Sequence, residues 1–150
     1  MKAKLFFILA LSFSVLLSCC ARRAYHTVTP QEQLVLNFYN WYCKELTLDH
    51  DPILDDAILK YVDKRTIDIL RMQRKTEEVI DHDYFIQGND FWLELCDGLT
   101  AHDLVIVDEK MSTVFVTFRV SKDKNYTIIV VVEKKDDAFY IKKVTDVWNP

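Results

Sequence analysis

The residues best suited to chemistry lie in one acidic segment near the middle of the chain. Asp81, Asp83 and Asp90 supply its carboxylates, and His82 lies between the first two. Carboxylates at alternate loop positions can coordinate a hard cation such as Ca²⁺, but the bidentate Glu of a calcium loop is missing at the required offset. The same side chains can instead accept hydrogen bonds from nearby backbone N–H groups and shape a turn. The sequence favours turn shaping, with a cation site as the alternative.

Histidine and cysteine form no pattern typical of a metal centre or a nucleophile. His50, His82 and His102 each precede an aspartate, but they lie in predicted turns, and neither the HExxH nor the Cys-x-x-Cys spacing occurs. Cys43 and Cys96 lie in apolar helical surroundings, where a thiol is unreactive. With 2 glycines in all, the chain also lacks the glycine-rich loops of dinucleotide-binding and P-loop proteins. We expect no catalytic residue, no metal and no cofactor, and the sequence favours a non-enzymatic protein.

Aromatic side chains are the third group of candidates. The residues that we single out are Tyr39, Tyr42, Tyr61, Tyr84 and Trp92. Tyrosine hydroxyls lining a cavity between helices and sheet would bind or isomerise a small apolar ligand, whereas rings exposed together would form a surface for a protein partner. The sequence favours a third alternative, in which most of these rings fill the dense core of a short chain.

The N-terminus has the features of a processing signal. Lys2 and Lys4 give it a basic start, and residues 5–17 are almost wholly apolar, which is too short for a transmembrane helix but typical of a signal-peptide core. The Leu-Leu-Ser-Cys sequence that ends at Cys19 looks like a bacterial lipobox, in which the cysteine receives diacylglycerol. A plain secretory signal is the alternative. The sequence thus predicts that Cys19 is the lipidated first residue of the mature protein.

The rest of the chain has room for one domain. We divide the chain into a lipoprotein signal peptide (residues 1–18), a lipidated tether (residues 19–29) and a single α+β domain (residues 30–150). The net charge of −4 argues against nucleic acid as a partner, because nucleic acids are polyanions. We expect a lipid anchor in the bacterial cell envelope, at the outer membrane and facing the periplasm. Cys43 and Cys96 would be able to pair there, although two partly buried free thiols are favoured.

Periodicity and capping signals predict about three helices in the first half of the domain. The first covers residues 30 to about 47, and Thr29 and Glu32 form a capping box at its start. A short second helix is expected within residues 53–61, after an Asp-Pro start.

The third predicted helix begins after Asp63, which is expected to cap it. It runs from residue 64 to about residue 75. Its apolar spacing places Ile67, Leu70 and Ile69 on the inner face.

The second half of the domain alternates with period two, as strands do. Four strands are predicted, at about residues 104–108, 113–120, 126–132 and 139–148. The third is apolar on both faces, which is typical of a central strand, and Lys142-Lys143 in the fourth indicates an edge or a bulge. Because short loops join consecutive strands, neighbours are antiparallel. The sequence therefore predicts an α+β domain whose helices pack on a curved four-stranded antiparallel sheet.

Three segments of the chain resemble a known family. They are residues 38–42, residues 61–65, and residues 81–90 together with Trp92. Over about residues 31–148, the chain is similar to an uncharacterised family of exported or lipid-anchored bacterial proteins known only as a domain of unknown function. The order of elements resembles the nuclear-transport-factor-like (cystatin-like) fold, in which a curved sheet wraps around an N-terminal helix. The resemblance implies a fold and a compartment, and it implies no activity.

Two functions are compatible with these features. The sequence favours a non-enzymatic envelope module that binds a protein or peptide partner; an immunity-type protein that neutralises a rival's exported toxin is one version. The alternative is a small-ligand carrier or pocket enzyme of the nuclear-transport-factor-like type. That alternative requires a cavity above roughly 300 Å³ with convergent polar groups. A sheet face filled by the protein's own side chains would argue against it.

Overall fold

The computed structural model describes residues 27–76, 83–88, 99–106, 108–119, 122 and 125–146. The elements, in chain order, are α2 (Pro30–Thr47), the 3-10 helix η1 (Asp56–Lys60), α3 (Lys64–Thr76), β1 (Thr100–Ile106), β2 (Met111–Arg119), β3 (Asn125–Lys135) and β4 (Ala138–Asp146). The strands form one antiparallel sheet in the order β1-β2-β3-β4. The predicted α+β class and the four-stranded antiparallel meander are confirmed.

The predicted signal peptide, Cys19 and most of the predicted tether lie outside the described residues. Among the helices that the structure does describe, none is both long enough and apolar enough to cross a membrane.

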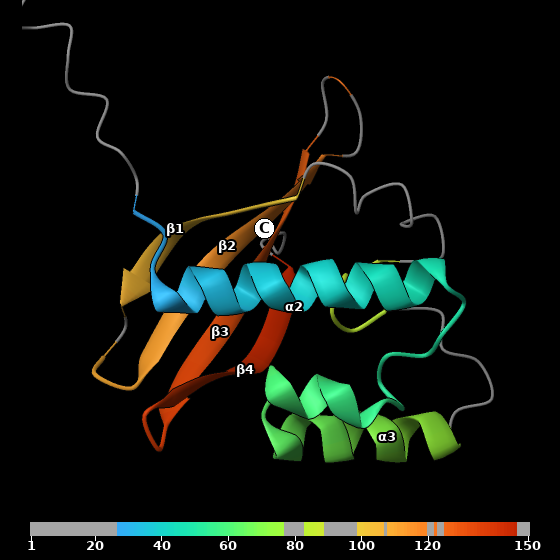
Figure 1. The fold of residues 1–150 in the computed structure, drawn as a ribbon. Coiled ribbons are helices and arrows are strands. Elements are labelled where there is room, and N and C mark those ends of the chain that lie inside the picture. Colours follow the sequence, from blue (N-terminus) through green and yellow to red (C-terminus); the bar gives the residue numbers. More distant parts are fainter. Residues whose placement is uncertain are drawn as a thin grey trace, which may run out of the picture.

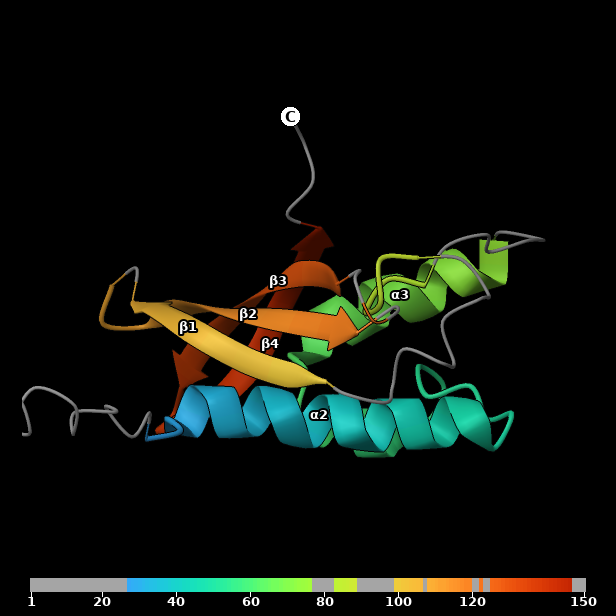
Figure 2. The same cartoon turned by 90° about the horizontal axis from the view of Figure 1, so that it is seen from above.

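The helices lie on one face and at one edge of the sheet (Figures 1 and 2). α2 runs across one face of the twisted sheet, which we call the inner face, and α3 lies beyond β4. The chain that leads into α3 is bonded to the free edge of β4. The Asp63 amide donates to the Ile141 carbonyl at 2.9 Å, and the Ile141 amide donates to the Tyr61 carbonyl at 2.8 Å. These bonds occupy backbone groups that an edge strand otherwise leaves exposed.

α2 begins at the predicted capping box. The Glu32 amide donates to Thr29 Oγ1 at 3.3 Å, and the Thr29 amide donates to Glu32 Oε2 at 2.7 Å. Pro30 occupies the first turn, where its missing N–H leaves no bond unmade. The buried side chains recur at three- and four-residue steps along one stripe; they are Glu32, Val35, Phe38, Tyr39, Tyr42 and Cys43. The prediction of this helix is confirmed.

The short second helix is the 3-10 helix η1. Asp55 caps it, because its Oδ1 accepts the Ala57 amide at 2.8 Å. Ile58 is the buried residue of this helix. One apolar anchor in five residues holds a single turn but gives too little buried surface for a longer helix.

α3 lies close to its predicted bounds. Asp63 Oδ1 accepts the Arg65 amide at 2.9 Å, as expected of a cap. Ile67 and Leu70 are buried, but Ile69 is 45% exposed, so the expectation that Ile69 faces inward is wrong. Residues two positions apart on a helix do not share a face, and Ile69 therefore cannot follow Ile67 into the core.

The sheet alternates as its sequence predicts. Along β2 the inward side chains are buried and the outward ones only partly so; the inward set is Ser112, Val114, Val116 and Phe118. β3 lies between β2 and β4, which confirms it as an internal strand. β1 begins at Thr100, four residues before the predicted start.

The Lys142-Lys143 pair lies where β4 is irregular. Val131 pairs with Lys143 and Val132 with Ile141, so Lys142 is the extra residue of a bulge. β4 is also one of the two edge strands of the described sheet. Both features expected from these lysines are present.

Cys43, near the C-terminal end of α2, is 6% exposed and disulfide-bonded. The preference for a free thiol at this position is therefore wrong. The other three cysteines, Cys19, Cys20 and Cys96, lie outside the described residues. The apolar helical surroundings that suggested an inert thiol fit a buried disulfide equally well, because both are apolar.

Candidate functional site

Tyr39 and Tyr42 lie in the core between α2 and the sheet. Both are fully buried. The Tyr39 hydroxyl donates to the Phe85 carbonyl at 2.8 Å, and the Tyr42 hydroxyl donates to Asp83 Oδ2 at 2.7 Å. Burial raises the pKa of both tyrosines well above the ordinary value, and the charge of Asp83 adds to the rise. Fully buried rings offer no surface to a partner, so these two candidates belong to the core.

Asp83 organises a tight turn over residues 83–88. Its Oδ1 accepts the amides of Phe85 and Ile86, each at 2.8 Å. The turn passes through Gln87, whose φ of 57° lies in the left-handed region. Both carboxylate oxygens of Asp83 are therefore engaged in holding the turn, one by backbone amides and one by Tyr42.

The other candidates from the sequence are dispersed. The Tyr61 ring is partly buried and stacks on Trp41, with ring centroids 5.6 Å apart. Asp81, Asp90 and Trp92 lie outside the described residues. Within the described ranges, His, Cys, Asp and Glu side chains form no group of three or more that could hold a metal ion.

Side chains of the described residues pack closely between α2 and the inner face of the sheet. Phe38 is fully buried, and its ring centroid lies 4.9 Å from those of both Tyr39 and Phe85. Tyr39 in turn meets Phe118 of β2 edge-on at 5.5 Å. A pocket enclosed by helix and sheet would need this space. In the described part of the chain, the aromatic rings occupy it.

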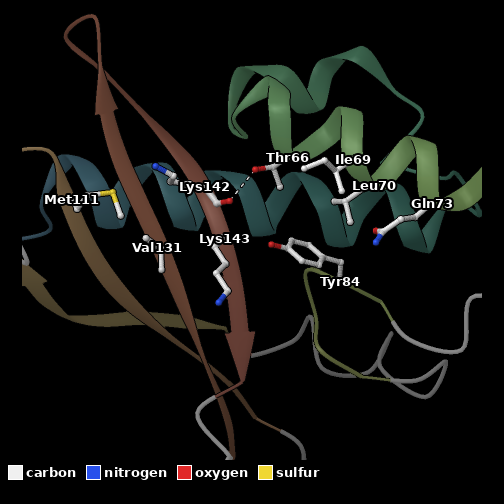
Figure 3. Close-up of a pocket in the computed structure, with 9 residues that line it drawn as sticks. All are labelled: Thr66, Ile69, Leu70, Gln73, Tyr84, Met111, Val131, Lys142 and Lys143. Carbon is white, nitrogen blue, oxygen red and sulfur yellow. Dashed lines mark hydrogen bonds between the residues drawn. The ribbon is translucent and has the colours of Figure 1, made fainter.

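A groove of about 560 Å³ lies between α3 and the outward side of β2, β3 and β4 (Figure 3). Its lining residues come from α3, the turn and three strands; they are Thr66, Ile69, Leu70, Gln73, Tyr84, Met111, Val131, Lys142 and Lys143. We call it the α3–sheet groove. Of the sequence candidates, Tyr84 alone lines it, and Figure 3 shows its ring between α3 and β4.

The walls of the α3–sheet groove are tied together by two hydrogen bonds. The Thr66 hydroxyl donates to the Lys142 carbonyl at 2.8 Å, which joins α3 to β4. The Val144 amide donates to the Tyr84 hydroxyl at 3.3 Å, which joins the turn to β4. Hydrogen bonds within the chain therefore hold the walls of the groove in place.

The charge of the groove is positive. The described residues that line it include two lysines and no acidic side chain. Lys142 Nζ lies 2.9 Å from Glu133 Oε1 and is thus neutralised within the chain. Lys143 is exposed and forms no ion pair with any described residue. An apolar groove with one uncompensated cation can bind an apolar group beside an anion.

The sequence pattern indicates Tyr84 but not the rest of this groove. Its floor comes from outward positions of strands, such as Val131 in the strand that reads as apolar on both faces. The apolar outward positions of that strand, together with the apolar Ile69 of α3, were the available signal. Their meeting depends on how α3 packs beside β4, which periodicity does not specify.

Solved structures that share this fold include two crystal structures. Both are of the type VI effector–immunity complex Tae3-Tai3 from Ralstonia pickettii, one native and one selenomethionine-labelled. The native structure has a TM-score of 0.71 and 21% sequence identity, over 83% of this chain and 99% of that chain. The labelled structure has a TM-score of 0.68 and 22% sequence identity, over 80% of this chain and 98% of that chain. The matched chain is the immunity protein Tai3.

No protein-family model and no curated protein matches this chain. The likeness to Tai3 establishes the fold, and it extends over nearly the whole of that chain.

Proposed function

We propose that this protein is an immunity-type protein, which binds an exported effector protein of the type VI kind and neutralises it. The observation that carries the proposal is the fold shared with Tai3, which takes in 98–99% of the Tai3 chain. A match that leaves almost nothing of the immunity chain unaligned supports a shared way of working better than a match to one substructure does. The fold assignment within the nuclear-transport-factor-like class is part of the proposal, supported by α2 lying across the sheet.

The two faces of the sheet support a binding role over a pocket enzyme. Among the described residues, the inner face is packed with buried rings such as Phe38 and Tyr39. The α3–sheet groove, by contrast, is open, apolar and preformed, with Tyr84 as its aromatic side chain. Protein partners use surfaces of this kind, because an aromatic or apolar anchor buried in a groove contributes most of the binding energy.

We further propose that the protein is lipid-anchored at Cys19 and faces the periplasm. The basic start, the apolar core and the lipobox-like sequence support this location. The disulfide at Cys43 also supports it, because disulfides persist in oxidising compartments such as the periplasm. A periplasmic protein is in a position to meet an exported toxin that enters that compartment.

Protection of living cells tests the function. The full chain is expressed in a sensitive host together with its candidate toxin, a protein directed to the periplasm that is chosen from the products of neighbouring genes because it kills that host when expressed alone. We expect growth with the chain and lysis or arrest without it. Equal killing in both strains would overturn the proposed function. Direct binding of the purified lipoprotein to the same toxin, by calorimetry, distinguishes neutralisation by binding from an indirect effect.

The anchor is tested separately with a matched pair of variants. Cys19→Ala should abolish labelling by a fatty-acid analogue and release the protein from the membrane fraction. Cys20→Ala should remain labelled and membrane-bound. Labelling that persists in Cys19→Ala would contradict the assignment of this residue, while the protection assay would still stand on its own.

A further inference from the structure

The apolar surface of the α3–sheet groove continues outside the groove. Ile69, which lines it, is 45% exposed, and Met72 is 62% exposed one helical turn further along α3. Side chains three positions apart are neighbours on a helix surface. A site for a small ligand encloses most of the ligand among apolar side chains. Here the apolar surface extends onto the open side of a helix, which fits a partner large enough to cover both.

The charges around the groove define the chemistry of that partner. Arg71 and Arg74 of α3 are not among the residues that line the groove, and each is paired within the chain, Arg71 with Asp56 and Arg74 with Asp51. Lys143 forms no such pair among the described residues. A cation covered by a partner is costly unless the partner supplies an anion. The occupant that fits therefore carries a carboxylate next to its apolar side chains.

The groove is also prepared for binding. Thr66 and Tyr84 fix its two walls to β4 through the hydrogen bonds already described. A groove that exists before binding avoids the free-energy cost of ordering its walls when the partner arrives. Preformed walls are what a protein needs in order to capture a partner quickly.

We propose that the α3–sheet groove is the effector-binding surface: it receives an apolar segment of the effector, and a carboxylate in that segment pairs with Lys143. This inference rests on the proposed function and specifies where on the chain it acts. Ile69 and Met72 are covered by the same segment, and Tyr84 packs against its apolar side chain.

Matched charge substitutions test the proposal. The binding of the purified protein to the toxin identified in the protection assay is measured for Ile69→Glu and Lys143→Glu. The controls are Leu48→Glu and Lys44→Glu, an exposed leucine and an exposed lysine at the C-terminal end of α2, neither of which lines the groove. We expect each groove variant to weaken binding about tenfold or more, because a buried anchor or ion pair is lost. Each control should bind within about threefold of the unchanged protein.

A charge series sharpens the role of Lys143. Lys143→Met keeps an apolar stem without the charge, so binding should weaken in the order Lys, Met, Glu. The salt dependence of association should be smaller for Lys143→Met than for the unchanged protein. A thermal melt on each variant confirms that the exposed substitutions leave the fold intact.

The outcomes separate the two proposals. If the unchanged protein binds the toxin and the groove variants bind equally well, the groove is not the interface, while the proposed function stands. If the unchanged protein does not bind, both proposals fall. A photoreactive residue at Met72 identifies the occupant: cross-links to an apolar, acidic segment of the toxin support the proposal. Cross-links to a second copy of this chain, or cross-links no more frequent than those from Leu48, would overturn it.

Discussion

The two faces of the sheet place apolar side chains in opposite situations. On the inner face, Phe38, Tyr39 and Phe118 are fully buried and in ring contact with one another or with shared neighbours. On the outward side, Val131 and Met111 are only partly buried and line an open groove. An antiparallel sheet with one face in solvent usually has polar residues there. Apolar residues on the outward side lie outside the core and are not needed to fill it. They therefore indicate that the outward side is a binding surface.

We expect the inner face to determine the stability of the fold and the groove to determine binding of the partner. The largest expected effect tests the role of the inner face in stability. Phe38→Ala should reduce the free energy of unfolding by about 3–5 kcal/mol, because a fully buried ring is replaced by a cavity. Ile69→Ala in the groove should cost less than about 1 kcal/mol, because Ile69 is already half in solvent. Urea denaturation measures both. Similar losses in the two variants would mean that the groove is part of the core after all.

The disulfide of Cys43 should stabilise the inner side by about 2–4 kcal/mol. Cys43→Ala should lose that amount and should then no longer respond to a reducing agent, whereas the unchanged protein should lose the same amount when it is reduced. Non-reducing peptide mapping identifies the partner, which we expect to be Cys96. A bond to Cys19 would contradict the lipid anchor, because one sulfur cannot carry both a diacylglycerol and a disulfide.

The Asp83 carboxylate should contribute nearly as much to the free energy of unfolding as the disulfide does. Asp83→Ala removes the acceptor of two backbone amides and of the buried Tyr42 hydroxyl, so we expect a loss of about 2–3 kcal/mol in unfolding free energy. Asp55→Ala is the matched control, since its carboxylate caps an exposed helix start, and should cost about 1 kcal/mol or less. Equal effects would show that the turn contributes nothing beyond an ordinary cap.

Local signals in the sequence were sufficient wherever one short segment decided the outcome. The capping box at Thr29 and Glu32, the alternation of β2 and the bulge at Lys142 all follow from residues within a few positions of each other. The groove does not follow from residues that are close in sequence, because Ile69 and Val131 come together only when α3 packs beside β4. The apolar periodicity also predicts that Ile69 faces inward, because the positions of apolar residues alone do not indicate which stripe of the helix packs against the rest of the protein.

The tyrosines show the same division. Their number in the first half of the domain indicated either core or a partner surface, and the structure divides them. Tyr39 and Tyr42 are buried, while Tyr84 lines the groove. The position of each tyrosine depends on the hydrogen-bond partner of its hydroxyl group. Such partners, for example the Phe85 carbonyl that accepts from Tyr39, lie more than forty residues away in the chain.

Alkaline pH should weaken the inner face in a predictable direction. Because burial raises the pKa of Tyr39 and Tyr42, the folded protein keeps their protons to a higher pH than the unfolded chain does. Their stabilising contribution is complete below pH 10 and should fall by up to about 1.4 kcal/mol per tyrosine for each pH unit above it. Urea unfolding from pH 9 to pH 11 measures this slope. The slope should be less steep in Tyr39→Phe, and an identical slope would contradict the assignment of Tyr39.

The smallest expected effect separates stability from recognition. Asp136 and Asp137 form the two-residue turn between β3 and β4, and both have positive φ, 51° and 65°. Glycine adopts that conformation without steric cost, so Asp137→Gly should raise the free energy of unfolding by about 0.5–1 kcal/mol. Asp137→Ala should lower it, because alanine tolerates the left-handed region less well than aspartate.

The turn lies outside the α3–sheet groove, since neither aspartate lines it. Both Asp137 variants should therefore bind the effector with unchanged affinity even though their stabilities move in opposite directions. If affinity followed stability across this pair, the division between an inner face that folds the protein and an outward side that recognises its partner would have to be abandoned. If affinity stays constant here and falls in Lys143→Glu, the two sides of the sheet are independent, and the immunity surface can be altered without touching the core.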